Sequence, residues 1–372
     1  MKNRKLMVLA IVTLTVILAA GITSRLRAPQ STINKQVLFP ELSGRINDVA
    51  AITIEGNKGT ITLRQEGGRW VLTSADNYPA LFNRIKRNVV GMAELRIVDE
   101  KTDNPEFYDR LGVEGPKVEG TKSMLITLQD KSGQTIAALI AGNKRQSSSN
   151  EPGLYVRKPE AARALLVEGF LDISEKPSHW FETHLFDIPS AQVQEARISY
   201  PHTGEKQMDN LVIRKDTREQ PDFIVNLPGL GKESSTTLIA NRISRGLEEM
   251  RADNVQSVKN FNFPDDETFI TTVNTFDGLV VTARLVKKDK TYYANFTFSA
   301  DPSAASGNPE KEDTAGTGTQ VSDGEQTSPV AQSQMLNKNL SPWVYEIPDF
   351  LYEALTTRPD QFRKQTLLPD EE

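Results

Sequence analysis

Hydrophobic and polar residues alternate along most of this chain in short runs, which glycine, proline and charged residues separate. The stretch AITIEGNKGTITLRQEGGRWVL has apolar residues at every second position, with glycine-containing breaks between the runs. Alternation with a period of two is typical of strands that bury one face, and short glycine-containing breaks are typical of hairpins. We therefore predict three antiparallel strands between residues 51 and 72.

A helical pattern follows these strands. Pro79 is expected to open a helix near a cap at Asp76 or Asn77, because proline suits the first helical turn. One apolar face of this helix is formed by residues at helical spacing: Leu81, Ile85, Val89 and Met92. Further along, the pattern predicts strands in SMLITLQD, QTIAALIAG and GLYVRKP, and a short helix from Glu160 to Val167.

The second half of the chain repeats the order of these elements. Three strands before a helix and three after it are predicted in EARISYPHTG, LVIRKD, DFIVNLPG, TFITTVNTF, LVVTARLVKK and TYYANFTFSA. Ser234 or Ser235 is expected to cap the helix. Its apolar residues each lie 158 positions after those of the first helix: Ile239, Ile243, Leu247 and Met250. Near the C-terminus WVYEIPDFLYEAL echoes LYVRKPEAARALL, with Leu355 seven positions after Pro348 as Leu166 is after Pro159.

These elements predict an α+β fold in which one N-terminal transmembrane helix precedes two similar units. Each unit, residues 47–187 and 190–366, is expected to be an antiparallel sheet with helices on one face. The matching order of elements favours an internal duplication, and two unrelated domains of the same class are the alternative. Residues 29–46 are expected to be a linker and residues 367–372 an acidic tail.

One segment of the second half, Asp301 to Pro342, interrupts the pattern. It is rich in Ser, Thr, Gly, Pro and acidic residues and nearly free of large apolar ones. Such a segment buries too little apolar surface to offset the entropy lost on ordering, so we predict a disordered insertion. It is placed where the first unit has GNKRQSSSNEP, and a tolerated surface insertion is favoured over a functional tether.

The N-terminus carries an apolar run from Leu6 to Ile22 with Thr13 and Thr15 as its polar interruptions. As a helix this run is about 25 Å long, the short end of what spans a bilayer. Signal-peptide cores are usually about 7 to 15 residues long and need a small-residue cleavage site, which is weak here, so a retained anchor is favoured over a cleaved export signal. The chain has no cysteine, which excludes a lipid-modified N-terminal cysteine.

Flanking charge predicts the orientation of this anchor. Lys2, Arg4 and Lys5 precede the run and favour a cytoplasmic N-terminus, although Arg25 and Arg27 follow it. Long C-terminal domains are translocated largely regardless of flanking charge. We therefore expect a single-pass protein of the bacterial inner membrane with the bulk of the chain in the periplasm.

Charge also limits the partners of the exported part. The whole chain has 44 basic and 49 acidic residues, and five basic but no acidic residues precede Pro29. Residues 29–372 therefore carry 39 basic and 49 acidic residues, a net charge of −10. Nucleic acid and anionic membrane surfaces are unfavourable partners for such a chain.

A scan for chemical motifs assigns no catalytic, cofactor-binding or metal-binding residue. In PGLGKESSTTLIANRI, the pair Gly231-Lys232 before a helix is similar to a phosphate-binding loop. Asn226 stands where that motif has its first glycine, and Glu233 stands where Ser or Thr would bind magnesium. We interpret the stretch as a loop that leads into a helix.

The three histidines give no site either. His179, Glu182 and His184 in HWFETH are three and two residues apart, which does not place them on one helical face. A helix end or a joint between units, with Trp180 and Phe181 buried as anchors, is favoured over a metal site.

The remaining polar candidates also receive no role. His202 lies in a predicted turn and has no G-x-S-x-G partner. The acidic pairs Asp265-Asp266 and Glu248-Glu249 are typical of solvated surfaces. A core position is favoured over a recognition patch for the aromatic residues Trp70, Trp343, Tyr345, Phe350 and Tyr352.

Two stretches carry a family resemblance. LFPELSGRINDVAAITIEGNKGTITLRQEGGRWVL, followed by YPALFNRIKRNVVGMAELRIVDEKTDNPEFYDRLGV, resembles the bacterial family called domain of unknown function 4340 (DUF4340). The likeness is best from Leu38 to Val113 and thins through the second half. It implies one N-terminal anchor and an association with ABC transporter components of the gliding-motility type, and it carries no catalytic residues to transfer.

The sequence therefore favours a non-catalytic, membrane-anchored extracytoplasmic interaction module, accessory to an ABC-type transport or cell-envelope complex. No cofactor is expected. The expected partners are the inner membrane, through Leu6 to Ile22, and a protein subunit. The alternative is an envelope hydrolase or carbohydrate-active enzyme, for which a cleft with converging acidic residues would be the evidence.

Overall fold

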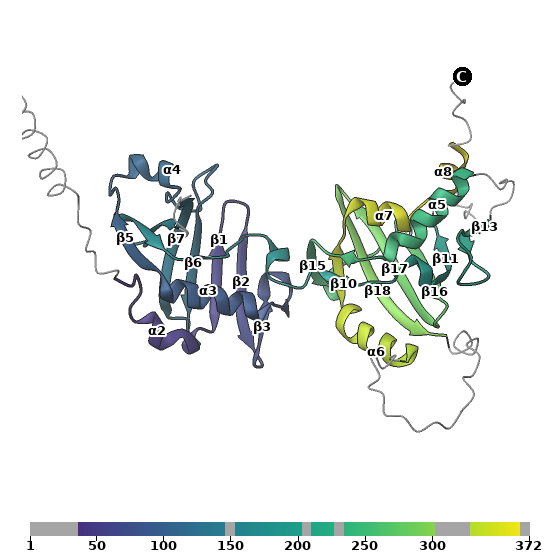
Figure 1. Ribbon diagram of the computed structural model, residues 1–372, viewed down its shortest axis with the longest axis horizontal. Helices are drawn as coiled ribbons and strands as arrows, with labels where there is room; N and C mark the ends of the chain where they lie inside the picture. The colour runs from purple at the N-terminus through teal and green to yellow at the C-terminus, as the bar shows by residue number, and fades with distance from the viewer. Residues whose placement is uncertain (1–35, 146–152, 203–209, 227–233, 302–327, 365–372) are drawn as a thin grey trace, which may run out of the picture.

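The computed structural model describes residues 36–145, 153–202, 210–226, 234–301 and 328–364 of the 372-residue chain. These residues form two lobes that lie end to end along the long axis of the molecule (Figure 1). Each lobe is a mixed α+β unit dominated by an antiparallel sheet. Within these ranges no helix is long and apolar enough to cross a membrane, and the predicted anchor, Leu6 to Ile22, lies outside them.

The first unit contains, among the described residues, a nine-stranded sheet with the order β4-β3-β2-β1-β6-β7-β8-β9-β5. Its strands are β1 (Ala51–Glu55), β2 (Thr60–Glu66), β3 (Arg69–Leu72), β4 (Tyr78–Pro79), β5 (Arg96–Glu100), β6 (Met124–Gln129), β7 (Thr135–Arg145), β8 (Gly153–Arg157) and β9 (Ala164–Glu168). Its helices are α2 (Leu42–Arg45), α3 (Phe82–Glu94) and α4 (Tyr108–Leu111), with the 3-10 turns η1 (Ile46–Asp48), η2 (Thr73–Ala75), η3 (Pro105–Phe107) and η4 (Pro177–His179).

The second unit contains, within the described ranges, an eight-stranded sheet with the order β13-β12-β11-β16-β17-β18-β19-β15. Its strands are β11 (Val193–Ser199), β12 (Leu211–Arg214), β13 (Ile224–Asn226), β15 (Asn254–Ser257), β16 (Phe269–Thr275), β17 (Leu279–Lys288), β18 (Thr291–Ala300) and β19 (Trp343–Glu346), and β10 (His184–Phe186) pairs separately with β14 (Met250–Arg251). Its helices are α5 (Ser234–Ser244), α6 (Pro329–Leu340), α7 (Asp349–Leu355) and α8 (Pro359–Lys364), with the turns η5 (Ser190–Gln192), η6 (Arg245–Leu247) and η7 (Val258–Asn260).

The two sheets have the same strand order. With β4 set aside, β3-β2-β1-β6-β7-β8-β9-β5 in the first sheet corresponds position by position to β13-β12-β11-β16-β17-β18-β19-β15 in the second. In each unit three strands precede one helix, α3 or α5, and an edge strand follows it. The strands predicted from alternation lie where they were expected, and β2 and β16 show the alternate burial of side chains on which the prediction rests.

Helix α3 differs from its prediction at its start. It begins at Phe82, and its N-cap, Leu81, has extended backbone and no side-chain cap. Asp76 and Asn77 instead adopt left-handed conformations, with φ of 55° and 67°, at the turn before β4. The helix buries its predicted face through Ile85, Val89 and Met92.

Helix α5 is shorter than the periodic pattern suggested. It includes Ser234 and Ser235 among its own residues, so neither serine is the residue before the helix. Ile239 and Ile243 are buried on α5, whereas Leu247 lies in η6 and Met250 in β14. All four are buried, so the apolar spacing continues past the end of the regular helix.

The predicted helix from Glu160 to Val167 is wrong. Residues 164–168 form β9, which pairs with β8 on one side and β5 on the other. Pairing on both edges overrides the helix-favouring composition of this segment. The echo between WVYEIPDFLYEAL and LYVRKPEAARALL therefore fails, because β19 corresponds to β9 and not to β8.

The predicted disordered insertion, 301–342, is wrong over its last part. Helix α6 has Ser328 as its N-cap, whose hydroxyl accepts a hydrogen bond from the Ala331 N–H at 3.3 Å. Asn337 fixes α6 to β18, because its side chain accepts a bond from the Phe298 N–H at 2.8 Å and donates to the Phe298 carbonyl. Residues 302–327 lie outside the described ranges.

The position given to this insertion is also wrong. The insertion joins β18 to β19, and the corresponding connection of the first unit joins β8 to β9 through residues 158–163. The segment GNKRQSSSNEP joins β7 to β8 instead.

Part of the predicted linker, 29–46, belongs to the first unit. The Ile97 N–H donates to the Gln36 carbonyl and the Leu38 N–H to the Leu95 carbonyl, both at 2.8 Å. Leu38 and Leu42 are buried in the core. The chain therefore enters the first unit along its β5 edge, and residues 29–35 and 367–372 lie outside the described residues.

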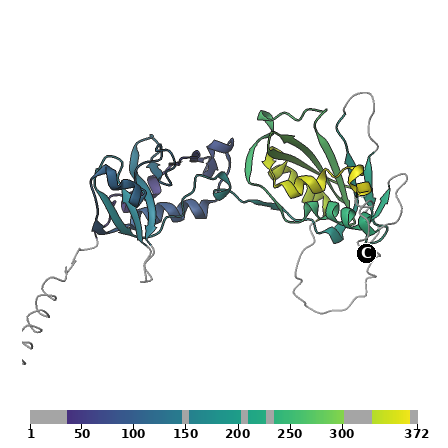
Figure 2. The ribbon, with the colours of Figure 1, turned by 90° about the horizontal axis from the view of Figure 1, so that it is seen from above.

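Aromatic side chains join the two units. The Tyr78 ring lies edge-on to Phe181, Trp343 and Tyr345, at centroid distances of 5.3, 4.8 and 6.3 Å. The Asp76 carboxylate accepts a hydrogen bond from the Ser257 N–H at 2.7 Å. Figure 2 shows the lobes meeting at this narrow joint. Because β10 pairs with β14, the chain enters the second unit before the predicted boundary at residue 187.

Candidate functional site

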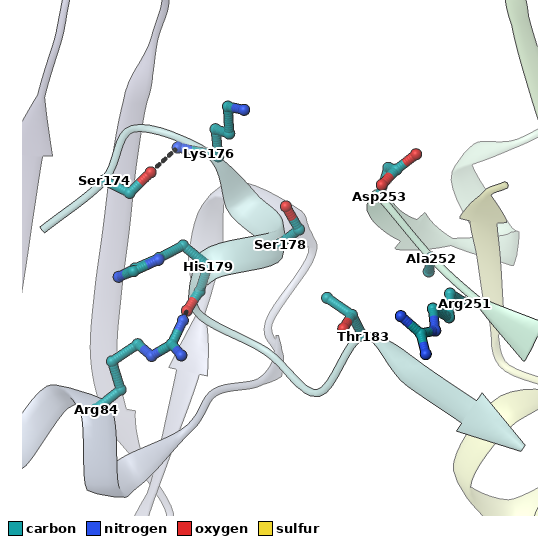
Figure 3. A pocket seen from close by; sticks show the side chains of 9 residues that line it. All are labelled: Arg84, Ser174, Lys176, Ser178, His179, Thr183, Arg251, Ala252 and Asp253. Carbon is teal, nitrogen blue, oxygen red and sulfur yellow. Dashed lines mark hydrogen bonds between the residues drawn. The ribbon is translucent and has the colours of Figure 1, made fainter. Parts of the chain in front are cut away.

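Two hollows in the described surface are candidates for a site: a polar pocket at the joint and an apolar groove on the second unit. The joint pocket has a volume of about 380 Å³. Its lining residues are Arg84, Ser174, Lys176, Ser178, His179, Thr183, Arg251, Ala252 and Asp253. Figure 3 shows Arg84, Lys176 and His179 on one side of the pocket, and Arg251 and Asp253 on the other.

Two basic groups on the first-unit side of this pocket, Arg84 and His179, already have partners. Arg84 donates to the His179 carbonyl, and its Nε lies 3.7 Å from a carboxylate oxygen of Asp172. The Nε2 atom of His179 lies 2.9 Å from the Asp172 carbonyl oxygen and 3.3 Å from its carboxylate. These bonds hold the segment between the units in place, which is a structural role.

One carboxyl group behind the pocket has an altered acidity. Burial raises the pKa of Glu346, and the negative charge of Asp253 raises it further. The Asp253 N–H donates to the Glu346 carbonyl at 2.8 Å, which keeps Asp253, the residue before β15, next to Glu346 of β19. A carboxyl group with a raised pKa is a candidate general acid, but Glu346 is not among the lining residues, and Asp253 is the only acidic residue in the lining of this pocket among the described residues.

The apolar groove lies between α5 with η6 and α7, and its volume is about 780 Å³. It is lined by Leu238, Asn241, Arg242, Arg245, Gly246, Glu248, Glu249, Arg251, Pro348, Phe350, Leu351 and Ala354. Leu238 and Phe350 are large apolar side chains that remain 68% and 63% exposed. Exposed apolar side chains gathered at one groove are typical of a binding surface.

Close packing at one glycine positions the two walls of this groove. A Cβ atom built on Gly246 would lie 2.7 Å from Cδ2 of Leu355 and 3.3 Å from Cβ of Ala354. Glycine therefore allows α7 to approach η6 more closely than any other residue would. Leu351 and Leu355 of α7 are buried by this contact, and Phe350 is left on the outer side.

Charges surround the groove unevenly. Arg242 donates to the Thr357 hydroxyl at 3.3 Å and to the Gln361 side-chain oxygen at 3.1 Å, both neutral groups. No ion pair found between described residues includes Arg242 or Arg245. At the other end, Glu249 pairs with Arg251 at 2.7 Å and Glu248 accepts the Ser190 N–H at 2.8 Å. Two arginines that form no ion pair with another described residue therefore lie beside exposed apolar side chains.

Comparison with known proteins places the chain in a family. Residues 70–269, more than half of the chain, match the family described as Domain of unknown function (DUF4340). The chain belongs to the DUF4340 family. The match runs from β3 of the first sheet to the start of β16 of the second, so the DUF4340 region includes both central helices and the Tyr78 and Phe181 side of the joint. No curated protein and no solved structure matches the chain.

The histidine cluster of this DUF4340 protein lies at the joint and not in one site. His179 ends η4, and His184 is exposed on β10 of the second unit. Trp180 and Phe181 between them are fully buried, as predicted. In the part of the chain that the structure describes, no group of three or more metal-ligating side chains comes together.

The other predicted candidates separate in the same way. His202 and the pair Asp265-Asp266 are exposed and are joined by a backbone hydrogen bond, from the His202 N–H to the Asp265 carbonyl at 3.2 Å. Gly231-Lys232 lies outside the described residues. Glu248-Glu249 lines the apolar groove, a role that sequence reasoning missed.

The aromatic residues were predicted to be core, which is correct for Trp70, Tyr345 and Tyr352. Trp343 is half-buried at the joint. The prediction is wrong for Phe350, which is exposed at the groove because it points away from the buried face of α7. Leu238 was also missed, although it lies one position off the buried Ile239 and Ile243 face of α5 and so belongs to the outer surface.

Proposed function

We propose that this chain is a non-catalytic, membrane-anchored module whose second unit binds a protein partner. The observation that carries the proposal is the apolar groove, with Leu238 and Phe350 exposed on its two walls. A groove between two helices that displays apolar side chains suits a segment of another protein better than a small polar substrate. The net charge of −10 over residues 29–372 is unfavourable for nucleic acid.

The proposed membrane anchor gives the two units different tasks. The run from Leu6 to Ile22 would lead, through about a dozen residues, to the β5 edge where Gln36 and Leu38 pair. The first unit then lies next to the membrane and the second unit lies beyond it, along the long axis (Figure 1). With the N-terminus in the cytoplasm, the groove is held on the periplasmic side of the bacterial inner membrane, away from the bilayer.

We further infer that the two units arose by internal duplication. The shared strand order supports it, and so does a pair of glycines. Gly91 on α3 approaches the chain that follows β9, with its Cβ position 2.7 Å from the Phe170 carbonyl oxygen, as Gly246 approaches the chain that follows β19.

The two copies differ in what covers the central helix. In the first unit Asn88 of α3 binds the backbone of Asp172, donating to its carbonyl at 2.9 Å and accepting its N–H at 2.8 Å. This extended segment closes the side of α3. In the second unit the corresponding chain forms α7, which leaves a groove beside α5. The second copy is therefore the one suited to bind.

The partner that fits the family resemblance is a subunit of an ABC-type transport or cell-envelope complex. A tag placed after Glu372, mild detergent extraction and mass spectrometry test this directly. The proposal predicts that transporter or envelope subunits co-purify in fixed proportion with the full chain, and that Phe350→Ala releases them while Phe82→Ala does not. Phe82 is a matched control, because it is 56% exposed on the first unit. Recovery of the chain alone from the membrane fraction would overturn the proposal.

A carboxylate-dependent envelope hydrolase or carbohydrate-active enzyme is the second candidate. It is favoured by one observation, the raised pKa of Glu346, whose backbone carbonyl accepts the N–H of Asp253, a residue that lines the joint pocket. Hydrolysis of envelope polysaccharide by the purified chain, lost in both Glu346→Gln and Asp253→Asn, would establish it. If the wild-type chain and both variants released sugar only at the background rate, these two residues would be excluded as the acid and base of a hydrolase.

A further inference from the structure

We propose that the groove takes an amphipathic helix of a partner protein, and that this helix carries acidic residues beside its apolar stripe. The inference rests on the proposed function and specifies the chemistry of the partner. Three features carry it: the spacing of side chains on α5, the apolar wall of α7, and two arginines that have no acidic partner among the described residues.

The side chains of α5 that line the groove are spaced as needed to contact one face of a docked helix. Leu238, Arg242 and Arg245 lie at positions i, i+4 and i+7, so they share one face that runs into η6. Phe350 stands on the opposite wall, with Leu351 and Ala354 below it. A helix laid between these walls would bury an apolar stripe against Leu238 and Phe350, which is the mode that helix-in-groove complexes use.

The charges decide what flanks that stripe. Arg242 binds neutral groups, and Arg245 forms none of the ion pairs found between described residues. Glu248 and Glu249 are already bound to the Ser190 N–H and to Arg251. The lining of the groove therefore has two arginines, Arg242 and Arg245, outside the ion pairs of the described residues against one such carboxylate, Glu248, which leaves an excess of positive charge. Guanidinium groups bind carboxylates in a fixed geometry. A partner helix with acidic residues next to its stripe satisfies both arginines.

An anionic membrane is disfavoured as the occupant. Arginines beside apolar side chains also suit an anionic bilayer, but a bilayer is an extended surface that meets the net charge of −10 of residues 29–372, whereas one helix in the groove meets mainly the charges within about a Debye length, roughly 10 Å. In the proposed topology the groove also lies on the second unit, which the first unit separates from the anchor. A second copy of this chain is the remaining occupant, and solution mass distinguishes it.

The test uses the full chain in detergent and three labelled peptides of about 18 residues, each a helix of about five turns. All three have the same leucine and phenylalanine stripe, flanked by glutamate, glutamine or lysine. Fluorescence anisotropy measures the dissociation constants at low and high salt. We expect the glutamate peptide to bind about tenfold more tightly than the glutamine peptide, the lysine peptide to bind weakest, and the preference to shrink at high salt.

Variants connect the preference to the groove. Phe350→Ala should weaken binding of the glutamate peptide by about tenfold or more, because it removes an exposed apolar anchor. The double variant Arg242→Glu, Arg245→Glu should reverse the order of the glutamate and lysine peptides. The controls are Phe82→Ala and Arg87→Glu, which change an exposed phenylalanine and an exposed arginine on α3. Both should leave all three constants unchanged.

The outcomes separate this inference from the proposed function. Equal binding of the three peptides, with full dependence on Phe350, would overturn the acidic partner and keep the groove as a protein-binding site. Peptide binding that is unchanged in Phe350→Ala would overturn both the acidic partner and the proposed protein-binding groove. If Phe350→Ala abolished binding to phosphatidylglycerol vesicles, the groove would be assigned to a membrane. If it converted a dimer of the chain to a monomer, the groove would be assigned to a second copy. Either result would overturn the inference.

Discussion

Three glycine-to-alanine substitutions test how the chain packs beside its two central helices. Gly44 on α2 has nothing within 4 Å of its Cβ position. The Cβ position of Gly91 lies 2.7 Å from the Phe170 carbonyl oxygen, and that of Gly246 lies 2.7 Å from Cδ2 of Leu355. Separations below 3.0 Å force a neighbour to move, so substitution at Gly91 and at Gly246 is expected to cost stability, whereas substitution at Gly44 is not.

The magnitudes follow from two opposing contributions. Alanine in place of glycine in a helix favours folding by about 0.5–1 kcal/mol. Overpacking a well-filled core costs about 1–3 kcal/mol. Gly44→Ala gains only the first contribution. Gly91→Ala incurs both, and is expected to lose about 1–2 kcal/mol net, because the clash is with backbone that Asn88 holds in place. Gly246→Ala should lose a similar amount, because Leu355 is fully buried and cannot swing away.

Thermal unfolding of the full chain measures the difference. For units of this size about 1 kcal/mol shifts Tm by about 2–4 °C. Gly44→Ala should raise Tm slightly, and Gly91→Ala and Gly246→Ala should lower it by about 2–8 °C. If Gly91→Ala melts at or above the Tm of Gly44→Ala, the close approach of α3 to the segment after β9 is not a feature of the folded protein.

Three further predictions concern buried polar groups and the joint. Asn88→Ala should lower stability by about 1–3 kcal/mol, because it leaves the part-buried N–H of Asp172 unbonded and removes one of the two contacts of its carbonyl, which His179 Nε2 also approaches at 2.9 Å; urea unfolding measures the loss, and Asn88→Asp, which can still accept from that N–H, should lose less. Tyr78→Ala should loosen the contact between the units and expose a protease site near Phe181, which limited proteolysis detects. The Phe82→Ala variant should be cleaved at the same rate as the wild type. Alkaline pH should destabilise the fold: burial raises the pKa of Tyr352 to about 12, so the folded state favours the protonated phenol, and stability that is constant below about pH 10 falls as pH rises toward that value. A pH titration of Tm checks the sign, and a rise in Tm above pH 10 would contradict it.

Local patterns predicted the strands of this protein well. Alternation with glycine breaks depends on neighbouring residues, so β1, β2 and β3 could be read directly from the chain. The helical face of α3 was predictable for the same reason. The shared order of elements also followed from local patterns. Matching one segment of the first half to one of the second was less successful, because the segment matched to helix α7 forms the strand β9.

Tertiary contacts decided the positions where prediction failed. Ala164–Glu168 has helix-favouring residues and becomes a strand because β5 and β8 both pair with it. Helix α6 had a readable signal, Ser328 before Pro329 at its first turn, that the polar composition around it concealed. The groove could not be predicted, since Leu238 and Phe350 are more than a hundred residues apart. Periodicity shows which face of a helix is apolar, but not what covers it.

Site-specific photocrosslinking in intact cells tests the central claim most directly. A photoreactive side chain at position 350 of the full chain should form an adduct with one discrete protein, and the double substitution Arg242→Glu, Arg245→Glu should abolish it. The same group at position 82 should give no such adduct. Adducts with lipid alone at position 350, or protein adducts equal at both positions, would contradict a protein-binding groove on the second unit.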